Sequence, residues 1–295
     1  MMIEFLKMHG LGNDFLVFDA RAHKPDDALS CPADLQIDEA AARLVADRRL
    51  GAGCDQIMIL RDAQLGGDIY LDMRNQDGSK TGACGNGTRC VASLIMAETG
   101  KTSCVIETMA GKLYATQKGT LIEVNMGAAH LEWDQIPLRD KGDTTAVSLA
   151  PHEDITGVAV NMGNPHIVLF VDDADEVDVA TRGAVLEQSP LFPEGVNVSF
   201  AHIMAEDAIR MRVFERAVGI TSACGSGACA VGVAAHRLGL ASRATQIVLD
   251  GGTLFIRWQD DGTVLMAGPV ATSYKGILEG AVLQAVMDAQ KAVIS

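Results

Sequence analysis

The feature that most constrains the fold of this chain is a glycine-rich cysteine segment that occurs twice. It reads Ala-Cys-Gly-Asn-Gly at residues 83–87 and Ala-Cys-Gly-Ser-Gly at residues 223–227. A strand-like run ends nine positions before each cysteine, at Asn75 in the first copy and at Glu215 in the second. A repeat that keeps its flanking features in order indicates an internal duplication rather than a chance similarity between two turns.

Three further pairs of landmarks recur in the same order. They are Gly12-Asn13 with Gly163-Asn164, Gln56 with Asn197, and Gly111 with Gly252. A chain of 295 residues can hold two medium-sized cores, so we expect two similar domains that face each other. The pattern is interrupted between about residues 128 and 147, where Pro137 and Gly142 occur. We therefore predict an N-terminal half over residues 1–130 and a C-terminal half over residues 145–272.

Both halves have the same predicted order of elements: short alternating strands, the cysteine segment, a helix and more short strands. The first helix runs through residues 90–98 and stops at Gly100, and the second runs through residues 229–237 and stops at Gly239. Glycine is common just after a helix. Both helices are apolar on nearly all sides, which is typical of buried helices. The predicted fold is α/β, of the α+β type, with each half a shell of strands around a central helix.

Composition and charge exclude several classes of function. The net charge is −14 without any Lys/Arg cluster, which argues against nucleic acid and anionic membranes as partners. No apolar run is long enough to cross a bilayer and no signal peptide is evident, so we expect a cytoplasmic protein. The seven cysteines are odd in number and lack Cys-x-x-Cys spacing, and no histidine pair has metal-ligand spacing. We expect reduced thiols, with neither a disulfide framework nor a bound metal.

Cys84 and Cys224 lie where a thiol becomes reactive. Unpaired N–H groups and the dipole at a helix N-terminus favour the thiolate and so lower the pKa of a cysteine there. The glycines beside each cysteine leave those N–H groups open to a carboxylate. Two such helix ends on opposite sides of an α-carbon would let a thiolate remove the proton from one face while a thiol returns one to the other. We therefore predict an acid–base pair that inverts an amino acid, and we regard the other five cysteines as inert.

Together these features resemble the diaminopimelate epimerase family along essentially the whole chain. The resemblance rests on motifs that are weak singly and specific in combination. They are Met-His-Gly-Leu-Gly-Asn-Asp-Phe at 8–15, Cys-Asp-Gln at 54–56, Asn-Gln-Asp-Gly-Ser at 75–79, Ala-Cys-Gly-Asn-Gly-Thr-Arg-Cys at 83–90, Gly-Asn-Pro-His at 163–166, Gly-Val-Asn-Val at 195–198, and Glu-Arg at 215–216 leading to Ala-Cys-Gly-Ser-Gly-Ala at 223–228. The resemblance implies interconversion of LL- and meso-diaminopimelate in lysine and peptidoglycan precursor synthesis, without pyridoxal phosphate, metal or any other cofactor.

The resemblance also implies roles for individual residues. Cys84 and Cys224 would be the catalytic pair, and His166 and Glu215 would hold the substrate ammonium and tune the cysteines. The residues that would bind the rest of the substrate are Asn13, Gln56, Asn75, Gly85, Asn86, Asn164, Asn197, Arg216, Gly225 and Ser226. In the family the C-terminal segment, here about 273–295, packs back onto the first half. Tyr274 matches a residue at the dimer contact, so a homodimer is expected.

Departures from the family pattern are few, and some alternatives stay open. Ala217 stands where Gly is common, Ser226 where Thr is common, and Cys54 where Ala is frequent. Proline-type racemases lack the amide motifs and Arg216, and phenazine-biosynthesis-like isomerases do not keep both cysteines. A racemase of another amino acid, or a binding protein that does not exchange the α-proton, fits the same residues. Nucleotide binding is disfavoured, because residues 51–53 lack the third glycine of a dinucleotide loop and no Gly-Lys-Ser/Thr occurs.

Overall fold

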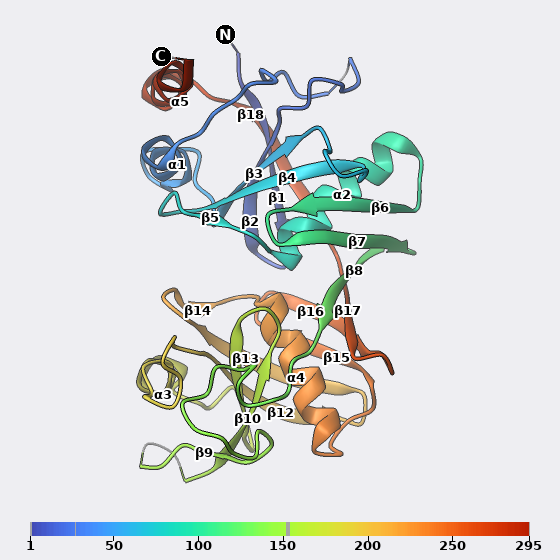
Figure 1. Cartoon of the computed structure of the whole chain (residues 1–295), viewed down its shortest axis with the longest axis vertical. Coiled ribbons are helices and arrows are strands. Elements are labelled where there is room, and N and C mark those ends of the chain that lie inside the picture. The colour runs from blue at the N-terminus through green and yellow to red at the C-terminus, as the bar shows by residue number, and fades with distance from the viewer. Residues whose placement is uncertain (1, 27, 152–153, 295) are drawn as a thin grey trace. The chain divides into compact units, whose positions relative to one another are not determined.

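The computed structural model of the chain describes residues 2–26, 28–151 and 154–294. It divides into two compact units, which we call the first unit (Met1–Val124 with Pro269–Ser295) and the second unit (Asn125–Gly268) (Figure 1). The domain limits inferred from the sequence, 1–130 and 145–272, stay a prediction. Among the described residues, no helix has the length and apolar character that crossing a bilayer requires.

The first unit is built on one mixed sheet with the strand order β18-β1-β2-β3-β4-β6-β7-β8. Its strands are β1 (Glu4–Gly10), β2 (Asn13–Asp19), β3 (Gln56–Arg61), β4 (Ile69–Asn75), β5 (Lys80–Thr81), β6 (Ser103–Thr108), β7 (Gly111–Lys118), β8 (Leu121–Ala128) and β18 (Ala271–Ile277). The pairs β2/β3 and β4/β6 are parallel, the other neighbours are antiparallel, and β5 pairs with β4. Helix α2 (Gly85–Thr99) packs against β1, β2, β6 and β7, while α1 (Glu39–Ala46) packs against β3 and against α5 (Gly280–Ile294).

The second unit repeats this order with β9-β10-β11-β12-β13-β15-β16-β17. Its strands are β9 (Val147–Ser148), β10 (Thr156–Asn161), β11 (Pro165–Phe170), β12 (Asn197–Ala205), β13 (Ala208–Glu215), β14 (Gly219–Thr221), β15 (Ala244–Leu249), β16 (Gly252–Trp258) and β17 (Thr263–Gly268). The parallel pairs β11/β12 and β13/β15 stand where β2/β3 and β4/β6 stand in the first unit. Helix α4 (Gly225–Arg237) packs against β10, β11, β12, β13, β15, β16 and β17. Helix α3 (Val179–Glu187) packs against β12, β13 and β14.

The central helices explain why each unit closes around itself. Nearly every residue of α4 from Gly225 to Ala235 is buried, as are most residues of α2 from Asn86 to Met96. A helix buried on all sides needs strands around it, because each of its faces must be removed from water. Gly100 ends α2 in a left-handed conformation with φ of 68°, as its sequence position predicts. The predicted fold class, two similar halves that each form a strand shell around a helix, is confirmed.

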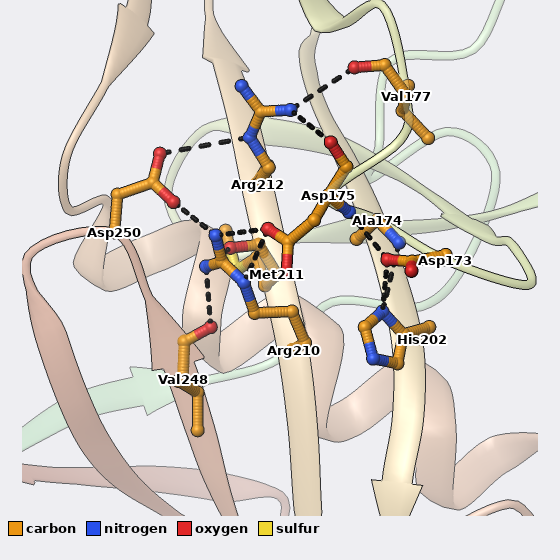
Figure 2. A network of polar contacts seen from close by, with 10 residues as sticks. All are labelled: Asp173, Ala174, Asp175, Val177, His202, Arg210, Met211, Arg212, Val248 and Asp250. Carbon is orange, nitrogen blue, oxygen red and sulfur yellow. Dashed lines mark hydrogen bonds and ion pairs between the residues drawn. The ribbon is translucent and has the colours of Figure 1, made fainter.

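Outside the predicted site, a group of charged side chains fixes the loop before α3 to β13. Arg210 binds Asp175 at 2.6 Å and also pairs with Asp250, while Arg212 donates to the carbonyl of Val177 (Figure 2). His202 accepts the Ala174 N–H at 2.9 Å. These contacts join chain segments about 30 residues apart and stabilise the outer face of the second unit.

Candidate functional site

Cys84 is the N-cap of α2. Its backbone is extended, with φ of −153°, and its Sγ accepts the Gly87 N–H at 3.3 Å. A cysteine sulfur thus takes the place that a Ser or Asp oxygen has at an ordinary helix start. A Cβ at position 87 would lie 2.2 Å from Met58 Cε, so the Met58 side chain would have to move, and 3.5 Å from Cys84 Sγ, which is an ordinary contact distance. The sequence around Cys84 therefore places its thiol among the first N–H groups of a helix.

Cys224 has the same position on α4. Its Sγ accepts the Gly227 N–H at 3.4 Å and lies 3.6 Å from Ser226 Oγ. A Cβ at position 227 would come within 3.2 Å of this sulfur and 2.8 Å of Met211 Cε. In both copies the glycine leaves room for a methionine side chain that packs against the helix start.

The electrostatic surroundings of Cys224 differ from the expectation that a helix end lowers its pKa. Burial and the negative charge of Glu215 raise the pKa of Cys224 well above its ordinary value, and the contacts from Ser226 and Gly227 oppose this only in part. Glu215 ends β13 and accepts a hydrogen bond from Thr221 Oγ1. Desolvation and a nearby anion both disfavour the thiolate. In this structure the Cys224 sulfur is a thiol at neutral pH.

The amide side chains of the first unit form two groups. Asn13 accepts from Asn86 Nδ2 at 3.1 Å, lies 4.0 Å from Cys84 Sγ, and donates through its own Nδ2 to Asp55 at 2.8 Å. Gln56 Nε2 donates to Asn75 Oδ1 at 2.9 Å, on adjacent strands whose register pairs these two residues. Asn13 and Asn86 are thus brought together with Cys84, whereas Gln56 and Asn75 form a pair of their own.

In the second unit a buried histidine takes part in the polar group. His166 is fully buried, and its Nε2 lies 3.0 Å from Asn164 Oδ1. Burial and the positive charge of Arg216 lower the pKa of His166 to about 3, so its ring is neutral. Since an amide oxygen only accepts, Nε2 carries the proton and Nδ1 presents a lone pair. That Nδ1 is buried and has no hydrogen-bond partner among the described residues.

Arg216 is held at the start of the β13–β14 turn. Its N–H donates to Asn197 Oδ1 at 3.1 Å, and its Nη1 donates to the carbonyl of Glu194 at 2.8 Å. Asn197 in turn donates to the carbonyl of Pro165 at 2.9 Å. The next residue, Ala217, has a left-handed backbone with φ of 61°, a conformation that glycine adopts more readily. The turn therefore keeps the backbone shape of a glycine turn without the glycine.

The other five cysteines are all buried, and Tyr274 is partly exposed. Burial raises the pKa of Cys31, Cys54, Cys90 and Cys104 to about 12, which makes these thiols unreactive. Tyr274 lies on β18, is 48% exposed and contacts the ring of Phe5 edge-on, with 6.1 Å between the ring centroids. Within the described parts of the chain, no group of three or more His, Cys, Asp or Glu side chains could hold a metal ion.

Asp55 was not assigned a role from the sequence, although it contacts a predicted site residue. It precedes Gln56 in one of the motifs, and that adjacency was the only available signal. Its contact with Asn13 joins positions 42 residues apart in sequence. Spacing along the chain does not reveal such a contact.

The chain is similar to known proteins over most of its length. The family model described as "Diaminopimelate epimerase" matches residues 5–132 and 158–272. The diaminopimelate epimerase of Acidiphilium cryptum is 51% identical over 280 residues, which cover 95% of this chain and 97% of that protein. The diaminopimelate epimerase of Rhodospirillum centenum is 49% identical, over 96% of this chain and 94% of its own.

Solved structures share the fold at low sequence identity. A phenazine biosynthesis protein of the PhzF family from Enterococcus faecalis superposes with a TM-score of 0.67 at 14% identity, covering 95% of this chain and all of its own. A hydroxyproline epimerase from Agrobacterium vitis, with bound trans-4-hydroxy-L-proline, has a TM-score of 0.64 at 15% identity, covering 94% of this chain and 92% of its own. At these identities the likeness establishes the fold alone.

Proposed function

The chain belongs to the diaminopimelate epimerase family, and from this premise we propose that it interconverts LL- and meso-diaminopimelate without a cofactor. Its being an isomerase follows from the family. The family supports the substrate, and the observation that carries the two-base mechanism is the duplicated helix start. In each unit a cysteine is the N-cap of the buried central helix, and its sulfur accepts a backbone N–H. Two such groups suit amino-acid inversion, because a single base more naturally returns the proton to the face it came from.

In the proposed mechanism, Cys84 and Cys224 act on one α-carbon. The thiolate of one cysteine removes the α-proton, and the C–H electron pair becomes a carbanion that is delocalised into the carboxylate. The thiol of the other cysteine then donates its proton to the opposite face and becomes the thiolate, so the charge of the pair is unchanged. N–H groups at the helix starts stabilise the negative charge on the carboxylate. The raised pKa of Cys224 supports its role as the thiol in the resting enzyme.

The polar groups suit a substrate with two amino-acid ends. The unpaired Nδ1 of His166 offers a lone pair to an ammonium N–H, and Glu215 offers a carboxylate. Backbone N–H groups from Gly85, Asn86, Gly225 and Ser226 would contact the reacting carboxylate. Arg216 would bind the distal carboxylate through two parallel hydrogen bonds. The amides of Asn13, Gln56, Asn75, Asn164 and Asn197 would donate to and accept from the remaining groups.

The first test uses reduced protein from which cofactors have been stripped. LL-diaminopimelate is incubated with it in deuterated water, and stereochemistry and α-deuterium are followed together. We expect the meso form to appear with deuterium at the inverted carbon, and L-lysine, which lacks the distal carboxylate, to be a poor substrate. The double variant Cys84→Ala/Cys224→Ala is the control for background exchange. Binding of diaminopimelate without exchange would contradict the proposal and favour a binding protein.

We place this reaction in lysine and peptidoglycan precursor synthesis, in the cytoplasm, because its product serves both. We also propose a homodimer with Tyr274 at its contact, as the family resemblance implies. Tyr274 is half exposed on β18, which pairs with β1 at one edge of the first-unit sheet. Light scattering is expected to give twice the chain mass of 31.2 kDa for the wild type and a smaller mass for Tyr274→Ala. A monomeric wild type would contradict the dimer.

A further inference from the structure

A cluster of charged side chains lies directly behind Asn13 in the first unit. Asp55 Oδ2 accepts from Asn13 Nδ2 at 2.8 Å and from the Asp14 N–H at 3.1 Å, and its Oδ1 accepts from Arg48 Nη2 at 2.7 Å. Arg48 also binds both carboxylate oxygens of Asp14, at 2.7 and 2.9 Å, and Asp14 pairs with the largely buried Lys7 at 2.6 Å. Burial opposes ionisation of Asp14, but hydrogen bonds from Arg48 and Lys7 hold the pKa of Asp14 below its ordinary range. Asp55 is thus fixed from two sides.

The contact with Asp55 decides which way the Asn13 amide points. A carboxylate accepts hydrogen bonds and donates none, so the NH₂ end of Asn13 must face Asp55. The carbonyl end then faces the helix start, where it accepts from Asn86 Nδ2 and lies 4.0 Å from Cys84 Sγ. If the amide turned over, its NH₂ would meet the NH₂ of Asn86, and its oxygen would face the Asp55 carboxylate, which cannot donate a hydrogen bond. The orientation is therefore set by Asp55, two contacts away from the thiol.

The second unit sets its equivalent asparagine in another way. The offset that relates Gln56 to Asn197 places Val196 where the first unit has Asp55, so no acid is available there. Asn164, the equivalent of Asn13, instead gives its carbonyl oxygen to His166 Nε2 at 3.0 Å. The two copies of one asparagine therefore have their amides fixed by different partners. An acid that arose in only one copy, and contacts a residue of the predicted site, has a specific use.

We propose that Asp55, held by Arg48, is a positioning residue that keeps the carbonyl oxygen of Asn13 turned toward Cys84 and the substrate. The oxygen can then accept a hydrogen bond from a substrate N–H, whereas a freely turning amide would offer its NH₂ for part of the time. This inference rests on the proposed function, because it assigns the Asn13 oxygen to substrate. Asp55 contacts Asn13 directly, so we assign its effect to the orientation of the Asn13 amide.

The test is a double-mutant cycle between Asp55 and Asn13. Loss of the partly buried hydrogen bond that orients the amide is expected to lower kcat/KM for LL-diaminopimelate about tenfold in Asp55→Ala. Asp55→Asn keeps an oxygen for Asn13, is the milder variant if Asp55→Ala folds poorly, and is expected to retain most of the activity. In an Asn13→Ala background, Asp55→Ala should cause no further loss of kcat/KM, because the side chain through which Asp55 acts has been removed. Losses that multiply would overturn the proposal.

The matched control is Asp14→Asn, which removes one charge of the same ion cluster, keeps an amide oxygen that can accept the Asp55 N–H, and does not touch the Asn13 side chain. We expect it to lower the Tm at least as much as Asp55→Ala while kcat/KM stays within about twofold. An equal loss of activity in Asp14→Asn would mean that activity follows the cluster, and would overturn the proposal. A second readout is independent of activity: hydrogen exchange of the Asn13 side-chain NH₂, measured by NMR with ¹⁵N-asparagine and assigned with Asn13→Ala.

This second readout separates the two proposals. Exchange is expected to be slow in the wild type and in Asp14→Asn, and fast in Asp55→Ala, because the NH₂ loses its acceptor. If the wild type fails to epimerise diaminopimelate, the proposed function falls, and the exchange measurement still decides whether Asp55 positions Asn13. Equal exchange in the wild type and Asp55→Ala would overturn the positioning role.

Discussion

The two units place a cysteine at the same point of the same helix, but they surround it with different chemistry. Cys84 is partly exposed and lies near the amides of Asn13 and Asn86, whereas Cys224 is 3% exposed and lies beside Glu215. The strands that lead to the two sites end equivalently, at a neutral Asn75 in β4 and at Glu215 in β13. Duplication thus supplied two thiols in one geometry, and later divergence made their surroundings unequal.

A second difference lies on the parallel strand pairs. Phe15 pairs with Gln56 in the first unit, and His166 pairs with Asn197 at the equivalent place in the second. Both Phe15 and His166 are fully buried, so a ring fills the same volume in each copy. Only the second unit places a polar ring nitrogen there. The scaffold positions were kept while the hydrogen-bonding groups changed.

The largest expected effect tests whether the two copies are equally necessary. Either Cys84→Ala or Cys224→Ala should lower epimerisation about a thousandfold or more, because each removes one of two proton carriers. The measurement is kcat for LL-diaminopimelate in both variants. Cys90→Ala and Cys229→Ala are matched controls on the same helices and should remain active. A single variant at 84 or 224 with near wild-type activity would contradict the two-base scheme.

The next prediction concerns the pH dependence of stability that His166 adds to the second unit. Its pKa is lowered to about 3 in the folded chain and is near 6.5 in the unfolded chain. Between those values only the unfolded state binds the proton, so stability falls as the pH falls, by about 1.4 kcal/mol per pH unit. His166→Gln keeps a donor for Asn164 and cannot ionise. Denaturant unfolding from pH 7 to 4 should show a shallower loss in this variant, and equal slopes would contradict the assignment.

A third prediction tests the electrostatic difference between the two cysteines. Burial and, after it, the charge of Glu215 raise the pKa of Cys224, so Glu215→Gln should increase the thiolate fraction and speed alkylation of Cys224 by iodoacetamide at pH 8. The experiment is done in the Cys84→Ala background, with the modified residue identified by peptide mass mapping. Glu194→Gln is the control, because its exposed side chain has no contact with Cys224 among the described residues. An unchanged rate in Glu215→Gln would show that burial alone sets the pKa.

Local signals carried most of what could be predicted from the sequence. The central helices, their cysteine starts and the stop at Gly100 follow from glycine spacing and apolar pattern, which depend on neighbouring residues only. The ends of β4 and β13 at Asn75 and Glu215 were predicted for the same reason. The duplication strengthened the prediction of the fold, because each weak sequence signal occurred twice.

Contacts between distant segments could not be predicted. The pKa of Cys224 was expected to fall at a helix end, yet it rises, because the packing of α4 against β13 buries the thiol beside Glu215. The cluster around Asp55 depends on Arg48 and Lys7, which approach it from different segments. The roles of the site residues, including Asn13, Gln56 and Arg216, stay predictions from the family resemblance.

The smallest expected effect concerns the turns that follow β4 and β13. The first turn has its left-handed residue at Gly78, three positions after the end of β4, with φ of 87°. The second turn has Ala217, two positions after the end of β13, with φ of 61°, and then Gly219, with φ of 97°. An alanine in this region is strained relative to glycine, so Ala217→Gly should raise the free energy of unfolding by about 0.5–1 kcal/mol. Gly78→Ala is the reverse experiment, and it should destabilise more, because its Cβ would lie 2.6 Å from the Glu39 backbone.

Ala217 also bears on recognition, since it follows Arg216 directly. Its N–H lies 3.4 Å from Glu187 Oε1, and the Val218 N–H donates to the Glu215 carbonyl at 3.1 Å. Because these contacts hold the turn in the shape that glycine would adopt, kcat/KM for LL-diaminopimelate should change by less than about twofold in Ala217→Gly. Denaturant unfolding and steady-state kinetics on one preparation check both numbers. A stabilised variant with weakened substrate binding would mean that the strained alanine helps to place Arg216, and the two turns would then differ in function as well as in backbone.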